Sequence, residues 1–195
     1  LRILRKVGTL CRIVPADLAQ DAQVTALCEA LADERIDLFI NNAGFGACGA
    51  FSETDAGKEL SMLRVNVLAM HRLFKFTLRK MEAQGFGTIL NVASSAGLLP
   101  GGPYMAGYYA SKAYVVSLTR GVARELQELH SPVYVCALCP GPVDTEFNDR
   151  AGVVFALKGI TPEFCVQEAM HGMMHRRTII VPSAFMRACT TAQKL

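Results

Sequence analysis

Three consecutive segments decide the fold: the strand candidate Gly87-Thr88-Ile89-Leu90-Asn91-Val92, a helical stretch from Tyr108 to Leu129, and the strand candidate Val133-Tyr134-Val135-Cys136-Ala137-Leu138. A strand, a crossover helix and a second strand in this order predict two parallel strands of one sheet. Both strand candidates are almost continuously apolar, which is typical of a sheet that helices cover on both faces.

Comparable elements extend on both sides of this unit. Further strand candidates lie at Cys11–Pro15, Asp37–Asn41 and Thr178–Val181. Helical spacing of apolar residues is found at 24–31 and 60–78, and Thr161-Pro162 is typical of a helix start with Thr161 as N-cap. We therefore expect one α/β domain over residues 1–195: a doubly wound parallel sheet of the Rossmann type, in three α/β/α layers.

Composition excludes several classes of protein. Hydrophobic residues make up 51% of the chain and charged residues 19%, which excludes a disordered chain. No apolar run approaches the roughly 18 residues that a membrane helix needs. The net charge of +3 comes from 20 basic and 17 acidic residues spread along the chain, so neither nucleic acid nor a membrane is an expected partner. Seven scattered cysteines favour reduced thiols and a cytoplasmic location.

The chemistry is expected at the carboxyl ends of the strands, where such sheets bind ligands. Tyr108 and Lys112 are four residues apart on a predicted helix and so share one face. A nearby ammonium lowers the pKa of a phenol, as a general acid/base near neutral pH requires. Taken alone, this pair is more often a surface lysine beside an aromatic ring.

Two polar residues strengthen the pattern. Ser94 follows the strand 87–92 and can donate to a carbonyl oxygen, although serines in Gly-rich loops are also ordinary turn residues. Asn66 interrupts an apolar helical stretch; such a residue is either exposed or, if buried, needs hydrogen-bond partners.

Together these motifs resemble the short-chain dehydrogenase/reductase family over most of the chain, from Ala16 to Val181. The matching motifs occur in family order: Asp17-Leu18, Asn41-Asn42-Ala43-Gly44, Asn66, Ser94, Tyr108 with Lys112, and Pro140-Gly141 with Val143 and Thr145. The resemblance implies an NAD(P)-dependent oxidoreductase that moves hydride between the cofactor and a small-molecule carbonyl or alcohol. The alternatives are a non-catalytic nucleotide-sensing relative and a pure interaction domain.

The resemblance also implies a role for each matching residue. Tyr108 is the general acid/base, Lys112 lowers its pKa and binds the nicotinamide ribose, and Asn66 anchors a water of the proton relay. Ser94 holds the carbonyl oxygen, with Ser95 as the rival for that role. The implied cofactor is NADP or NAD, with NADP slightly preferred, and its further contacts are Asp17, Asn42, Ala43, Gly44, Pro140, Gly141, Val143 and Thr145.

The family's Thr-Gly-x-x-x-Gly-x-Gly phosphate loop has no counterpart in this chain. We therefore expect an N-terminal strand-helix-strand unit, about 30 residues or more, to be missing from it. In the family's strand order, 3-2-1-4-5-6-7, this loss separates Cys11–Pro15 from Asp37–Asn41 and exposes an apolar sheet edge. By analogy we expect a homodimer or homotetramer that pairs through the helices at 55–84 and 108–129.

Other motifs receive ordinary interpretations. Residues 44–49 match Gly-x-Gly-x-x-Gly, but no helix follows at once, so a substrate-side loop is expected. Cys136 and Cys139 should point to opposite faces of a strand, and no metal site is expected, His171 and His175 included. Met170, Met173 and Met174 are expected in core or lid packing. The segment 146–160, with Arg150, Phe155 and Leu157, is the candidate lid; Leu98, Leu99, Met105 and Phe147 suggest a partly apolar substrate.

Overall fold

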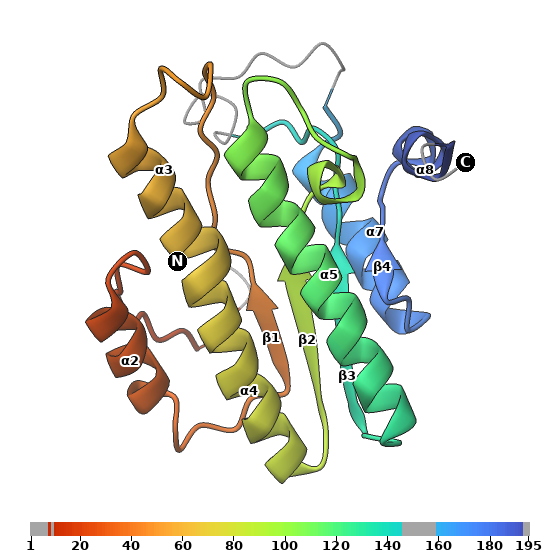
Figure 1. The fold of residues 1–195 in the computed structure, drawn as a ribbon. Coiled ribbons are helices and arrows are strands. Elements are labelled where there is room, and N and C mark those ends of the chain that lie inside the picture. Colours follow the sequence, from red (N-terminus) through yellow and green to blue (C-terminus); the bar gives the residue numbers. More distant parts are fainter. Residues whose placement is uncertain (1–7, 9, 146–158, 193–195) are drawn as a thin grey trace.

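Four parallel strands form the centre of the molecule. The computed structural model describes residues 8, 10–145 and 159–192. The strands β1 (Leu38–Asn41), β2 (Gly87–Val92), β3 (Val133–Leu138) and β4 (Ile179–Ile180) follow one another in the sheet in chain order (Figure 1). The bounds of β2 and β3 are those predicted from the sequence.

Helices connect the strands and cover both faces of the sheet. They are α2 (Asp21–Ala30), α3 (Ala56–Leu63), α4 (Met70–Gln84), α5 (Ala106–Glu128), α7 (Pro162–Met174) and α8 (Ala184–Ala192). On one face, α4 and α5 bury Ile89 and Val135, and on the other α7 buries Leu90 and Cys136. This alternation of buried residues along β2 and β3 confirms the doubly wound, three-layer fold.

The helix starts follow from their capping residues. Asp55 accepts a hydrogen bond of 2.6 Å from the backbone N–H of Lys58 and so begins α3. Thr161 does the same for Phe164 at 3.2 Å, with Pro162 in the first turn of α7, as the sequence predicts. The short helix α8 and the 3₁₀ turn Ser95–Leu98 were not predicted.

The predicted helix at 60–78 is continuous but not uniform. Between α3 and α4 the chain makes a π-helical stretch, Arg64–Ala69, with Asn66 inside it. Such widened turns are frequently found at functional sites. The wider turn places Asn66 in the interior, 1% exposed.

The predicted strand at Cys11–Pro15 is wrong. Within the described residues this segment pairs with no strand, and Ile13 is 59% exposed. The sheet accordingly ends at β1, whose outward side chains Leu38 and Ile40 are 44% and 51% exposed. The physical reason is that an isolated strand has no partner for its backbone hydrogen bonds. β1 is therefore an edge strand of the described sheet, and its exposed Leu38 and Ile40 agree with the expected apolar edge.

The cysteine and methionine motifs have different positions in this fold. Cys136 and Cys139 belong to core clusters on opposite faces of the sheet, and the seven cysteines are unpaired. Met170 and Met174 are exposed on α7, so only Met173 fulfils the packing prediction. Among the described residues no cluster of side chains could hold a metal ion, and no helix is long and apolar enough to cross a membrane.

Candidate active site

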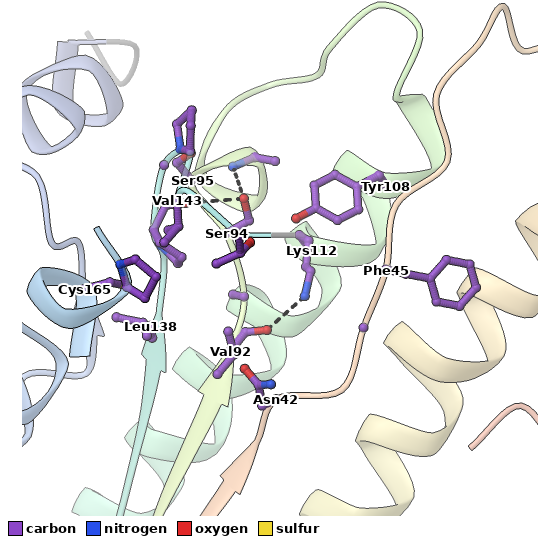
Figure 2. Close-up of a pocket in the computed structure, with 18 of the residues that line it drawn as sticks. Asn42, Phe45, Val92, Ser94, Ser95, Tyr108, Lys112, Leu138, Val143 and Cys165 are labelled. Carbon is purple, nitrogen blue, oxygen red and sulfur yellow. Dashed lines mark hydrogen bonds between the residues drawn. The ribbon is translucent and has the colours of Figure 1, made fainter. Parts of the chain in front are cut away.

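A cavity of about 810 Å³ lies at the carboxyl ends of β2 and β3. Its walls come from segments far apart in the sequence: the loops after β1, β2 and β3, the start of α5 and the start of α7. Figure 2 shows side chains from these segments converging on one space. The cavity therefore lies at the edge of the sheet where a parallel α/β fold binds its ligands.

Tyr108 and Lys112 lie in the first two turns of α5, and both line this cavity. Their residues are 7% and 5% exposed. The Lys112 Nζ donates a hydrogen bond of 2.9 Å to the backbone oxygen of Val92 at the end of β2, and it lies 5.9 Å from the centre of the Tyr108 ring (Figure 2). A phenol and an ammonium thus face the same cavity, one helical turn apart.

Burial controls the ionisation of both groups. Desolvation raises the pKa of Tyr108, and a side-chain hydrogen bond with Ser94 offsets part of that rise. The sequence predicts a lowered pKa for this phenol, and the structure corrects that direction, because removal from water outweighs every other influence on Tyr108. Desolvation also lowers the pKa of Lys112 to about 8, since a buried ammonium loses its hydration.

Ser94 and Ser95 both line the cavity, but their contacts differ. The hydroxyl of Ser94 interacts with Tyr108 and accepts a hydrogen bond of 3.1 Å from the backbone N–H of Ala96. Ser95 is anchored by its backbone, whose N–H donates to the oxygen of Pro140 at 2.7 Å. Of the two serines, the structure places the Ser94 hydroxyl beside the phenol.

A close backbone contact holds the serine loop against α5. A side chain at Gly97 would collide with the backbone oxygen of Lys112, so only glycine permits this approach. The contact brings the 3₁₀ turn Ser95–Leu98 onto the helix that carries Tyr108. The position of Ser94 relative to Tyr108 therefore depends on Gly97.

Asn66 lies behind the cavity wall rather than on it. Its Oδ1 accepts from the backbone N–H of Phe45 at 3.1 Å, and its Nδ2 donates to the oxygen of Phe45 at 2.9 Å and to Ser111 Oγ at 3.1 Å. These bonds use both N–H groups of the amide. The side chain therefore holds the loop after β1 in place, and the water-anchoring role stays a prediction.

Most of the predicted cofactor contacts lie on the cavity wall. Besides Tyr108 and Lys112, these are Asn42, Gly44, Pro140, Gly141, Val143 and Thr145. Ala43 and Asp17 are not among the lining residues. The Asp17 carboxylate accepts a hydrogen bond of 3.0 Å from Ala19 N–H in the turn before α2, so its visible contact is local.

Several lining residues were not identified from the sequence. Tyr109 follows Tyr108, and Pro162, Cys165 and Val166 approach from the start of α7. The helix-start signal at Thr161-Pro162 could have placed that helix end at the sheet edge. Only the tertiary structure shows that it reaches this cavity.

The residues proposed for substrate contact are divided. Met105 lines the cavity, whereas Leu98 packs against the main core and Leu99 is not on the wall. Residues 146–158 of the candidate lid lie outside the described residues. This segment includes Phe147, Arg150, Phe155 and Leu157. A bridge between Val143 and Ile160, with Asp144 N–H donating to the oxygen of Ile160 at 3.0 Å, joins the two ends of that segment.

Comparison with known proteins gives a consistent result. Residues 2–152 match the family described as short chain dehydrogenase. An uncharacterized oxidoreductase of Thermotoga maritima is 32% identical over 146 residues, which are 75% of this chain and 57% of that protein, so the chain spans little more than half of that relative.

Two solved structures contain the fold of this chain. A short-chain dehydrogenase from Sphingobium yanoikuyae in complex with NADPH has a TM-score of 0.88 at 29% identity, covering 99% of this chain and 76% of that one. A short chain dehydrogenase/reductase from Burkholderia phymatum in complex with NAD has a TM-score of 0.85 at 27% identity, covering 97% and 77%. With its cavity at the carboxyl ends of a doubly wound parallel sheet, this chain belongs to the short-chain dehydrogenase family.

Proposed function

We propose that the protein is an NAD(P)-dependent oxidoreductase that interconverts a carbonyl compound and an alcohol, with Tyr108 as general acid/base. One observation carries this proposal: the phenol of Tyr108, the hydroxyl of Ser94 and the ammonium of Lys112 converge on a single cavity at the carboxyl edge of the sheet. Hydrogen-bond donors gathered around one point suit a carbonyl oxygen that becomes an alkoxide.

In this proposal each residue of the cavity has one role. Ser94 donates to the carbonyl oxygen and orients it. Tyr108 transfers its proton to that oxygen during reduction and takes it back during oxidation. The raised pKa keeps Tyr108 protonated at neutral pH, which favours reduction. Lys112, whose Nζ lies 5.9 Å from the centre of the Tyr108 ring, donates to groups in the cavity.

The residues present fit the nicotinamide half of a dinucleotide. Gly44 has no side chain, and a Cβ there would lie 3.0 Å from Asn66 Oδ1 and 3.3 Å from Lys112 Nζ, so the bare backbone leaves the ammonium accessible from that side. Lys112 would hold the ribose, and Pro140, Gly141, Val143 and Thr145 would hold the carboxamide end. When bound, the cofactor supplies or accepts the hydride. The two structural neighbours bind NADPH and NAD, respectively, which supports either form.

The lining supports a substrate that is apolar next to its carbonyl group. Met105 and Tyr109 form one side of the cavity, and Cys165 and Val166 form another. Within the described part of the lining, the carboxylate of Asp144 opposes the charge of Lys112, and one N–H of that ammonium is already bound to Val92 O. A neutral ketone with bulky apolar groups therefore suits this wall better than a keto acid.

We also propose that the protein forms a homodimer or homotetramer through α4 and α5. Leu68 next to α4 is 53% exposed, and Tyr114 on α5 is 37% exposed, with its hydroxyl 2.7 Å from His71 Nδ1. These side chains offer apolar surface for a second copy. Light scattering tests the assembly; a monomer at all concentrations would contradict it.

The decisive experiment measures binding and turnover separately. NADPH and NADH are titrated by their fluorescence, and then a panel of neutral ketones, keto acids and aldehydes is tested for cofactor oxidation. Binding followed by turnover of neutral ketones is the expected result. Binding without turnover on any compound would favour a nucleotide-sensing role, and absent binding would reject the proposal.

A further inference from the structure

The hydroxyl of Ser111 lies at the junction of the catalytic helix and the cavity wall. Ser111 is on α5, one turn after Tyr108 and next to Lys112, and is 1% exposed. Its Oγ donates to the backbone oxygen of Tyr108 at 2.7 Å and accepts from Asn66 Nδ2 at 3.1 Å. Ser111 is not a lining residue, so it acts on the cavity only through its neighbours.

The first of these bonds is ordinary and the second is not. A serine in a helix commonly donates to the carbonyl of the preceding turn. That bond satisfies the hydroxyl proton but does not explain why a buried amide from another helix is directed at the same oxygen. The Ser111 hydroxyl donates its one proton to the backbone oxygen of Tyr108. The Ser111 oxygen can therefore only accept a hydrogen bond from Asn66.

The network continues from Asn66 to the loop after β1. The amide of Asn66 binds both the N–H and the carbonyl oxygen of Phe45, which fixes that residue's backbone in position and direction. Asn42, Gly44 and Phe45 line the cavity beside the start of α5, where a Cβ at Gly44 would lie 3.3 Å from Lys112 Nζ. An unbroken chain of hydrogen bonds therefore runs from the Tyr108 backbone through Ser111 and Asn66 to the adjoining wall at residues 42–45.

We propose that Ser111 is a positioning residue that sets the distance between the Tyr108 helix and the 42–45 wall, and thereby preorganises the cavity for cofactor. The inference rests on the proposed function. Without the hydroxyl, Asn66 loses an acceptor and the wall is less constrained. Cofactor binding must then order the 42–45 wall, which uses part of the binding free energy. The cofactor affinity is therefore expected to fall more than kcat.

The chain contains a close structural control. Thr119, two turns further along α5, donates to Val115 O at 2.7 Å and accepts from Asn91 Nδ2 at 3.0 Å. It is 0% exposed and lines no part of the cavity. Thr119→Val therefore removes an equivalent pair of hydrogen bonds at a position away from the cavity. Ser117→Ala makes the same serine-to-alanine change at an exposed position of the same helix.

The test compares wild type, Ser111→Ala, Thr119→Val and Ser117→Ala below their unfolding temperatures. Ser111→Ala is expected to raise the cofactor Kd and KM about tenfold while kcat changes by less than about threefold. Thr119→Val should lower the unfolding temperature to a similar degree with KM unchanged. Equal KM values for Ser111→Ala and Thr119→Val would overturn the proposal, as would a fall confined to kcat. An inactive wild type would instead count against the proposed function.

Discussion

Two stretches of α5 contain the same arrangement of hydrogen bonds but differ in the residues that they bury. In both, a buried hydroxyl donates one turn back along the helix and accepts from an asparagine amide of a neighbouring element: Ser111 with Asn66, and Thr119 with Asn91. Around Thr119 the helix buries neutral side chains, such as Val115 and Val116.

Around Ser111, by contrast, the helix buries groups that can ionise. Tyr108 and Lys112 are almost fully removed from water, and their pKa values move in the directions that disfavour charge. Burying such groups costs stability, whereas burying Val115 and Val116 contributes it. The first turns of α5 thus carry the chemistry, and the later turns hold the helix on the sheet.

The largest difference between the two stretches should come from Tyr108→Phe. Loss of the phenol oxygen removes the proton donor, and turnover should fall by about 10³-fold, within the range for general acid/base groups. Cofactor affinity should stay within about twofold. Steady-state kinetics and fluorescence titration measure the two effects. Tyr104→Phe, at an exposed position that does not line the cavity, is the matched control. Near-normal turnover of Tyr108→Phe would show that another group moves the proton.

Lys112→Met tests the cost of the buried ammonium. Because the folded pKa is about 8 against 10.5 when exposed, the penalty is fully present below pH 8 and disappears towards pH 10.5. Turnover should be lost. At pH 7 the variant should be more stable than wild type by roughly 3 kcal/mol before loss of its hydrogen bond is counted.

The pH dependence of this difference separates it from other effects. Cys136 and Cys139 have raised pKa values, about 11 and 12, and lower the stability of both proteins as pH rises above about 9. Lys112 lowers the pKa of Cys139, so this value differs between the variant and wild type. Both thiols nevertheless stay protonated in the folded proteins up to about pH 11, so their contribution is the same in the two proteins from pH 8 to pH 10. The advantage of Lys112→Met should therefore shrink from pH 8 to pH 10; a constant difference would mean that Lys112 titrates normally.

Leu126→Ala addresses the later turns. Leu126 is 5% exposed in the main core, and truncation of a buried leucine costs about 2–4 kcal/mol. Chemical denaturation should show this loss, while kcat/KM measured at low temperature stays within about twofold. A large fall in kcat/KM of the folded variant would show that the two stretches are not separable.

The smallest expected change is that of Thr119→Val on stability. The substitution keeps the shape of the side chain but leaves Asn91 Nδ2 without its acceptor, which costs about 1–3 kcal/mol. Differential scanning calorimetry can measure it against Ser117→Ala, which should change stability by less than about 0.5 kcal/mol. If both variants have the stability of wild type, the hydrogen bond between Thr119 and Asn91 contributes little to the free energy of unfolding.

Much of the fold could be read from local patterns. The strands β2 and β3 are apolar runs bounded by turn residues, and Thr161-Pro162 marks a helix start that the structure confirms. The strand predicted at Cys11–Pro15 failed because strand formation depends on a pairing partner, which no local pattern reports. The π-helical stretch at Asn66 was equally hidden, since its apolar spacing is close to that of an α-helix.

The candidate site shows the same division. Spacing alone put Tyr108 and Lys112 on one face of a helix, because a helix repeats every 3.6 residues. It could not show that Asp17 lies off the cavity wall, that Ser111 connects two walls, or that α7 contributes Cys165 and Val166. Those facts depend on how separate elements meet.

The sequence by itself determined the alternation of strands and helices from β1 to β4, the family and the pair of groups on α5, because periodicity and short motifs are properties of neighbouring residues. Only the tertiary structure decided which groups lose contact with water. It reversed the expected pKa shift of Tyr108, because desolvation is imposed by every element packed around a side chain and not by the residues beside it in the chain.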